Sequence, residues 1–497
     1  MPKVLRPCLQ RKRKSSGFKF FFAALRFQYG HGFALRTPQP NKPTPRLSMN
    51  NTTTAPSISP TQAMWFWLKL GFISFGGPAG QIGIMHQALV VERGWLSEKR
   101  FLHALNYCML LPGPEAQQLA TYLGWLMHKT WGGVWAGLLF VLPSLFILIG
   151  LSWVYVSYGE LPWVAAVFFG IKPAVIAIVL QAVHRIGSRT LHTPAMWSIA
   201  GVSFIAIAVW QMPFPWIVLA AGLGGAILAK LAPGQISAPG SHSQTSSTTQ
   251  RPAVIDDHTP TPNHALFSLR RLIGVLLAGA VLWLLPMWLL HSLYGDDNTL
   301  TRMGGFFSKA ALMTFGGAYA VLPYVYQGAV ETFQWLSPQQ MMDGLALGES
   351  TPGPLIMVVA FVGFLGGHAH PVQTAYPLLG SACLGAVVAT WFTFLPSFIF
   401  ILAGGPLVES TQNQIRFTAP LTAITAAVVG VMLNLALFFA YHVLWPQSDS
   451  AHFAWFPALL TVACAVALLR LKWSVLRVLC VSALAGLLHL LLTQLMQ

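Results

Sequence analysis

Charged side chains inside apolar stretches are the residues of this chain that could do chemistry. Lys69, Lys172 and Lys309 lie within such stretches, and Glu115 and Glu349 lie beside Pro-Gly-Pro segments. An ionised group in lipid is costly, so a buried cation is expected to face an anion and a buried carboxylate to take up protons readily. The pattern predicts a site that binds an anion and exchanges protons.

Glycine and proline interrupt the apolar stretches beside these charges. Phe-Gly-Gly occurs at residues 75–77 and 315–317, and Pro-Gly-Pro at 112–114 and 352–354. Such residues end one helix and begin another at membrane depth, which leaves backbone amides unpaired. A helix N-terminus there binds an oxyanion through N–H groups and a partial positive charge. The alternative is that the breaks are only kinks and points of close packing.

The predicted substrate-binding residues either flank a break or carry a positive charge. They are Lys69, Ser74, Gly76, Gly77, Gln81, Gly113, Lys172, Lys309, Thr314, Gly316, Gly317 and Gly353. The predicted proton-coupling residues are Glu115, Glu349 and His86. The sequence indicates no catalytic residue.

Several of these residues also have a structural interpretation. Lys69 and Lys309 can extend to the membrane interface, Glu115 can cap a helix, and His86 can pack as a neutral ring. Lys172 has no counterpart in the second half of the chain, because Ala419 precedes the proline that matches Pro173. That asymmetry predicts one substrate or proton site rather than two equal ones.

The breaks belong to an internal repeat. Residues 69–114 align with 309–354 at a constant offset of 240, and Leu-Pro-Ser at 142–144 matches 395–397 at an offset of 253. Two hydrophobic halves with Gly/Pro interruptions at corresponding places are typical of secondary transporters. The pattern predicts a duplicated transport unit.

Composition indicates a helical membrane protein. The chain is 55% hydrophobic and 8% charged, whereas a soluble domain has about 25% charged residues. Unbroken apolar runs exclude an outer-membrane barrel, whose strands alternate in polarity. Five scattered cysteines give neither a disulfide framework nor a zinc motif, and no phosphate-binding loop is present, so we expect no metal, no cofactor and no ATP-driven step.

The expected organisation has five parts. They are a basic tail at 1–62, a first repeat domain at 63–232, a flexible linker at 233–269, an extra helix and loop at 270–302, and a second repeat domain at 303–497. Residues 1–50 hold 11 of the 29 Lys and Arg residues and no Asp or Glu, and Met49 is an alternative start for the chain. Nucleic-acid binding is not expected in a chain otherwise built for lipid.

Hydropathy predicts an all-α protein with about thirteen transmembrane helices. If each broken helix crosses once, seven crossings separate the two repeats, which makes them inverted. Lys and Arg in alternate loops place the N-terminus in the cytoplasm; Arg185, just after a span expected at 162–184, is one of these loop residues. If the broken helices are instead re-entrant, we expect the parity to change and the repeats to be parallel.

The motifs resemble one known family. KLGFISFGGPAGQIG at 69–83, LLPGPEAQQ at 110–118, TFGGAYAVLPYV at 314–325 and GLALGESTPGPL at 344–355 are similar to the chromate ion transporter family. The resemblance, which runs from residue 69 to about 402, implies a long, two-domain bacterial member that exports chromate from the cytoplasm across the inner membrane, driven by the proton motive force. Its implied partners are chromate, protons and the lipid bilayer. A sulfate or other oxyanion carrier, a membrane-bound chromate reductase and a homodimer remain open.

Overall fold

Helices make up the part of the chain that the structure describes. The computed structural model describes residues 58–231, 253–256, 262, 264–371, 378–410, 418–445 and 453–496. The basic tail with Met49, and most of the expected linker, lie outside these residues. The isolated β-bridge between Leu96 and Ile255 is the one extended pairing in the described ranges.

The helices of the first half follow the expected order. They are α1 (Pro60–Ile73), α2 (Gly77–His86), the π-helix η1 (Gln87–Glu92), α3 (Glu98–Cys108), α4 (Glu115–Tyr158), α5 (Pro162–Thr190), α6 (Pro194–Ala208) and α7 (Phe214–Leu231). The extra helix is α8 (Leu269–Tyr294).

The second half repeats this order from α9 onward. It contains α9 (Thr299–Met313), η3 (Ala318–Val321), α10 (Leu322–Tyr326), η4 (Gln327–Thr332), α11 (Pro338–Ser350), η5 (Leu355–Met357), α12 (Val358–Ala369), α13 (Leu378–Ser410), α14 (Thr418–Leu444), α15 (Trp455–Leu469) and α16 (Val475–Leu495).

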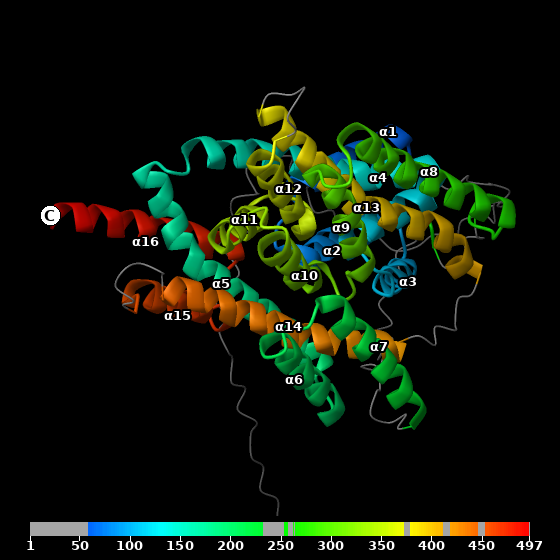
Figure 1. The fold of residues 1–497 in the computed structure, drawn as a ribbon. Coiled ribbons are helices and arrows are strands. Elements are labelled where there is room, and N and C mark those ends of the chain that lie inside the picture. The colour runs from blue at the N-terminus through cyan, green and yellow to red at the C-terminus, as the bar shows by residue number, and fades with distance from the viewer. Residues whose placement is uncertain are drawn as a thin grey trace, which may run out of the picture. The chain divides into compact units, whose positions relative to one another are not determined.

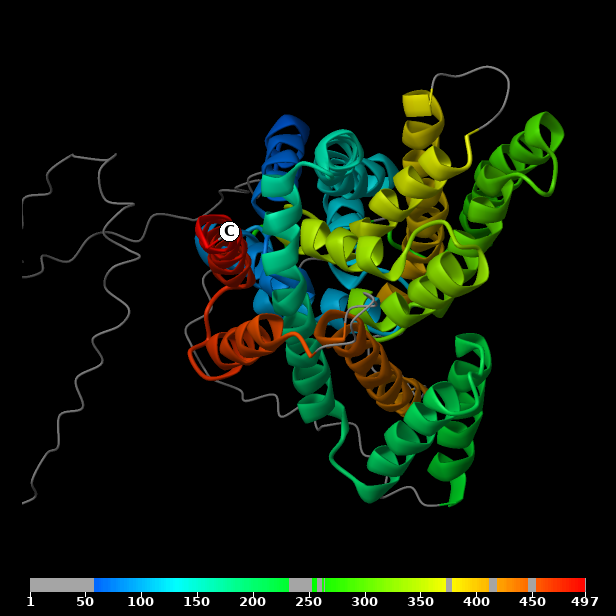
Figure 2. The ribbon, with the colours of Figure 1, turned by 60° about the vertical axis from the view of Figure 1, so that its left-hand side comes forward.

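Seven of the described helices are long and apolar enough to span a membrane, namely α4, α5, α7, α8, α13, α14 and α16. The prediction of an all-α membrane protein is therefore confirmed. In α14, 67% of the most apolar window is buried within the protein, but in α8 only 6% is. Both views place α8 at the periphery beside α13 (Figures 1 and 2).

The long helix α4 consists of two antiparallel limbs. His128 and Lys129 leave helical geometry, and Lys129 has a positive φ of 59°. Gly124 packs against Gly132, and Thr121 packs against Gly137, as expected for a chain that reverses between them. The sequence predicts separate spans at 99–128 and 132–157, and the limbs at 115–127 and 130–158 meet at that boundary.

The four broken segments each fold back on themselves. We call them hairpin 1 (residues 60–92), hairpin 2 (98–127), hairpin 3 (299–332) and hairpin 4 (338–369), and their tips are the Gly-Gly and Pro-Gly-Pro breaks. In hairpin 1, the ring of Phe66 near the start lies 5.6 Å from that of Trp95, just past the end. In hairpin 3, Phe306 and Phe333 are likewise 5.7 Å apart.

Hairpins 2 and 4 show the same reversal. Arg100 on the first limb of hairpin 2 and Tyr122 on the second limb both bind the carboxylate of Glu409. In hairpin 4, Gly344 on the first limb packs against Phe361 on the second. Each broken segment that hydropathy counted as one span therefore begins and ends on the same side of the protein.

The two repeats are inverted. Gly137 on the second limb of α4 contacts Phe398 on α13, and Gly133 contacts Leu402. Residue numbers therefore fall along one helix as they rise along the other. These two limbs occupy equivalent places in the repeats and run antiparallel. Between the repeats the crossings are the second limb of α4 and then α5, α6, α7 and α8, an odd number. The expectation that re-entrant segments make the repeats parallel is wrong, because folding back two segments removes two crossings.

Candidate anion site at four helix breaks

The four hairpin tips meet, and they bind across the repeats. The Gly113 N–H in hairpin 2 donates to the Thr314 carbonyl in hairpin 3 at 2.7 Å. The Gly353 N–H in hairpin 4 donates to the Ser74 carbonyl in hairpin 1 at 2.8 Å. These two bonds are related by the repeat. Each Pro-Gly-Pro turn is thus held by the other repeat, and these two amides are occupied rather than free for an anion.

Glycine is required at the tips by backbone geometry. The six tip residues Gly76, Gly77, Gly113, Gly316, Gly317 and Gly353 have φ values between 70° and 129°. Residues with a Cβ rarely adopt such angles. The break positions predicted from the sequence are therefore genuine interruptions of the helices.

Two serines pack closely against tip glycines of the other repeat. A Cβ added to Gly113 would collide with Ser397, and one added to Gly353 would collide with Ser144. Both serines are fully buried and belong to the matching Leu-Pro-Ser motifs. Close approach at these points depends on glycine, so the centre tolerates no larger residue there.

Several buried polar atoms around the tips have no partner among the described residues. They are the side-chain oxygens of Ser74, Gln81, Gln117, Gln118 and Ser144. The amide groups of Gln81 and Gln118 are held in place, since each donates to a tip carbonyl, Gly353 and Pro112 respectively. Buried polar groups in native proteins are normally paired, so this concentration indicates a place for water or a polar solute.

A cation that the sequence analysis missed lies beside the tips. Arg185 on α5 places its guanidinium carbon 5.4 Å from the ring centre of Tyr319, and the Tyr319 hydroxyl donates to Glu349 at 2.5 Å. The charge of Arg185 acts on Glu349 and also on Glu115. Glu115 in turn lies beside Gly317. Arg189 acts on Glu115 as well. Arg185 is therefore the cation that the two predicted carboxylates share.

Arg185 was assigned from its sequence to a cytoplasmic loop, because the span was expected to end at residue 184. The helix continues to Thr190, which carries Arg185 into the protein. The available signal was the absence of any strong helix breaker between Lys172 and Thr190 other than Pro173 and Gly187. Arg185 has no cationic counterpart in the second repeat, so the alignment of the halves did not mark it.

Lys172 lies elsewhere, in a second charged cluster. Its amino group is 3.8 Å from the buried carboxylate of Asp343, which also accepts a 2.9 Å hydrogen bond from Tyr155. Lys172 and Arg185 are separated by 13 residues of α5, or about 20 Å along the helix. The structure does not bring Lys172 to the hairpin tips.

The remaining predicted residues are also apart from the tips. Lys69 on α1 and Lys309 on α9 are exposed, and each lies five residues before the C-cap of its helix, Ser74 or Thr314. His86 pairs with Glu98 at 2.6 Å, on the side of α2 away from the tip. The tips thus hold Ser74, the six glycines, Gln81, Thr314, Glu115 and Glu349 from the predicted set, with Tyr319, Ser144, Ser397 and Arg185 added.

The fold and the site together define a class: an inverted-repeat helical membrane protein whose broken helices surround one polar centre, as in secondary transporters. Comparison of sequences gives the family. The model of the chromate transporter family matches residues 61–226 and 301–487, and the chain belongs to that family.

Individual relatives agree with this assignment. The chain is 34% identical to the chromate transport protein of Pseudomonas aeruginosa, over 78% of this chain and 83% of the relative. It is 28% identical to that of Cupriavidus metallidurans, over 82% and 88%. An uncharacterized transporter of Bacillus subtilis, 26% identical, covers 31% of this chain but 89% of its own length, so it is about one repeat long. No solved structure matches the chain.

Proposed function

We propose that this protein exports chromate across the bacterial inner membrane, driven by the proton motive force, and that it thereby gives resistance to chromate. The observation that supports this proposal most directly is the meeting of four helix breaks with Arg185 beside them. The relatives that match most of the chain include proteins named for chromate transport. The basic residues of alternate loops support a cytoplasmic N-terminus.

A tetrahedral dianion fits the chemistry of the centre. The guanidinium of Arg185 offers several N–H donors in a planar fork, a geometry suited to two oxygens of one oxyanion. The N-termini of α2 and α4 begin at the tips and add unpaired backbone amides. The hydroxyl groups of Ser74 and Ser144 are further donors without a partner among the described residues.

Protons affect anion binding through the two carboxylates that share Arg185. In the empty centre, one ionised carboxylate, Glu349 or Glu115, is enough to neutralise the arginine charge, so the cation is not left unpaired. An entering dianion competes with them for the same guanidinium. Protonation of either carboxylate therefore favours anion binding. Outward movement of negative charge is favoured by about 2.3 kcal/mol per charge for each 100 mV of inside-negative potential.

The deciding experiment compares chromate accumulation in cells with and without the chain, using the Arg185→Gln variant as an inactive match. Lower accumulation that requires Arg185 supports export. Transport of labelled sulfate but not chromate in vesicles would instead identify a sulfate or other oxyanion carrier. Formation of Cr(III) by the purified protein would indicate a reductase.

A further inference from the structure

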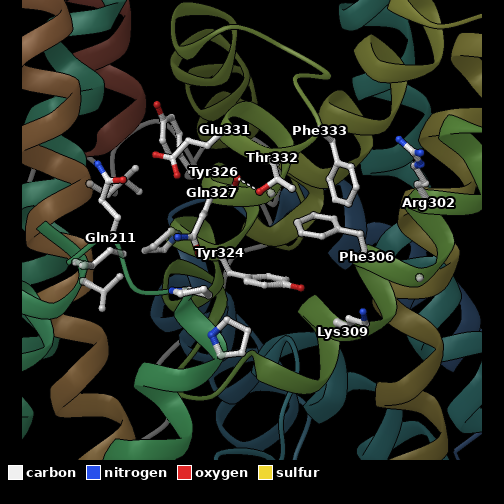
Figure 3. Close-up of a pocket in the computed structure, with 18 of the residues that line it drawn as sticks. Gln211, Arg302, Phe306, Lys309, Tyr324, Tyr326, Gln327, Glu331, Thr332 and Phe333 are labelled. Atoms are coloured by element: carbon white, nitrogen blue, oxygen red, sulfur yellow. Dashed lines mark hydrogen bonds between the residues drawn. The ribbon is translucent and has the colours of Figure 1, made fainter. Parts of the chain in front are cut away.

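Away from the tips, hairpin 3 encloses a cavity of about 990 Å³. Lys309, Arg302 and Phe306 of α9 form one wall, and Tyr324, Gln327 and Thr332 of the opposite limb form another (Figure 3). The loops around residues 211–213 and 295–298 border the same space. The cavity therefore opens where hairpin 3 begins and ends.

The first repeat has an equivalent depression of about 680 Å³ on α1. Six of its lining residues match lining residues of the larger cavity at the offset of 240. The pairs are Thr61 with Thr301, Gln62 with Arg302, Trp65 with Gly305, Phe66 with Phe306, Lys69 with Lys309, and Arg93 with Phe333. The two spaces are thus the same feature of the repeat.

A lysine and an arginine line each space. Neither Lys69 nor Lys309 forms an ion pair with any described residue. Thr301, which is 4% exposed and lines the larger cavity, has a hydroxyl without a partner in the described chain. The arginine occupies different repeat positions in the two spaces. In the larger cavity it is Arg302, whereas in the smaller space it is Arg93, which matches Phe333 and stacks on the Phe66 ring at 4.9 Å. Two cations are therefore present in both spaces despite different sequences.

Other charges in the larger cavity are largely balanced. Arg302 pairs with Asp297 at 2.7 Å, and His291 pairs with Asp296. Glu331 is the lining carboxylate without an ion pair among the described residues. It lowers the positive potential that Lys309 provides. The smaller space has no lining carboxylate, so it is the more cationic of the two.

The two spaces open on opposite faces of the protein. His128 binds the Ile58 carbonyl, and Gly71 packs against Leu139, so α1 runs parallel to the second limb of α4. That limb is antiparallel to α13, the corresponding helix of the second repeat. Hairpins 1 and 3 consequently enter from opposite sides, with their tips at the shared centre.

We propose that Lys69 and Lys309 mark two outer subsites for an inorganic tetrahedral oxyanion, one on each face, through which the anion passes to and from the central site. This inference rests on the proposed function. Each lysine is five residues, or about 8 Å of helix, from the tip that its own hairpin contributes. In this proposal the lysines bind the anion at the outer subsites, and Arg185 binds it at the central site.

The test measures sulfate and chromate uptake into vesicles of uniform orientation, prepared in both orientations from zwitterionic lipid. Lys309→Gln should raise KM about tenfold for anion presented at the hairpin 3 face, and Lys69→Gln should do so at the other face. Lys309→Arg should restore the KM. Glu331→Gln should lower it at the same face that Lys309→Gln affects.

Lys230→Gln, which removes an exposed positive charge outside both spaces, is the matched control and should leave KM at both faces unchanged. Suppose that the wild type transports the anion. If a lysine variant then changes KM equally at both faces, or leaves KM unchanged at both, the outer subsites are overturned and the proposed function stands. If Lys309→Gln changes KM only in vesicles of anionic lipid, the cavity binds a lipid headgroup, which would also overturn the outer subsites. Absence of transport by the wild type would instead contradict the proposed function.

Discussion

At the scale of single residues, Arg185 is the group on which the central site depends. Lys69 and Lys309 drew attention because the repeat duplicates them, yet five residues of helix turn a side chain by about 140° from the direction of the break. Arg185 is present once, on a helix whose end was expected two turns earlier than Thr190. Repetition in the sequence marks the scaffold, whereas the charges that give the site its chemistry differ between the copies.

Arg185→Gln should therefore abolish transport. Removing a charged donor from a buried oxyanion site costs about 1.5–3 kcal/mol per lost hydrogen bond, so anion binding should weaken at least about tenfold. Sulfate or chromate binding to purified protein measures the effect. Lys230→Gln removes an exposed positive charge near the end of α7, away from both carboxylates, and should weaken binding less than about threefold. Similar losses in the two variants would argue against a direct role of Arg185.

The carboxylates give the second prediction. In the wild type, ionised Glu349 competes with the anion for Arg185, so anion affinity should fall as pH rises through the titration of Glu349 and Glu115. Glu349→Gln should raise affinity at neutral pH and flatten this dependence, and Glu115→Gln together with Glu349→Gln should remove it. Binding measured from pH 5 to 8 tests this. Glu349→Asp, which keeps the charge, should retain the slope.

At the scale of elements, each hairpin tip is completed by the other repeat. Gly113→Ala and Gly353→Ala should abolish transport while the protein still reaches the membrane, because the added methyl meets Ser397 or Ser144 and the φ values of 129° and 108° disfavour alanine. Transport and membrane content are measured in parallel. Gly83→Ala, at a helical position with open space around it, should be harmless.

A pair of charged clusters links the repeats away from the tips. Arg100 of α3 binds Glu409 of α13 at 2.7 Å, and Asp343 of α11 accepts from Tyr155 of α4 at 2.9 Å. Because α4 and α13 are antiparallel, these contacts lie at opposite ends of the helix pair. Both connect a hairpin of one repeat to a long helix of the other.

The second cluster changes the expectation for Lys172. An unpaired lysine could be replaced without loss of stability, but Lys172 pairs with Asp343, whose side chain is 4% exposed. Lys172→Met leaves that carboxylate without its cation and should destabilise the protein by about 2 kcal/mol, seen as a lower Tm. Asp343→Asn in the same chain should recover most of the loss. A Lys172→Met protein with wild-type Tm would contradict the pairing.

At the scale of the whole molecule, inversion determines which ends of the helices are accessible from each side. Cysteines introduced at Tyr158 and at Asp296 should label from the periplasm, and one at Ser188 should not. Both reactive positions follow an odd number of crossings from a cytoplasmic N-terminus, whereas Ser188 follows an even number. Labelling of Ser188 from outside would reverse the assignment.

The sequence was sufficient for the helices, the duplication and the break positions, because apolar length, the offset of 240 and Gly/Pro chemistry are local signals. It was not sufficient for the partners across the repeats. That Gly113 bonds to Thr314, or that Arg100 reaches Glu409, depends on how two distant segments pack, and one sequence carries no local trace of it. The sequence left the course of the broken segments open between a single crossing and a re-entrant hairpin for the same reason.

The exposed helix α8 completes the odd number of crossings that an inverted repeat requires. Only 6% of its most apolar window is buried within the protein, yet as the last crossing before α9 it brings the start of the second repeat to the face opposite the start of the first. It contacts the second repeat at few places, where Trp283 donates to Ser308 and Gly279 packs against Ile399. Outside these contacts its sequence should tolerate change as long as about 20 apolar residues remain, whereas its removal would make both repeats begin on the same face of the membrane.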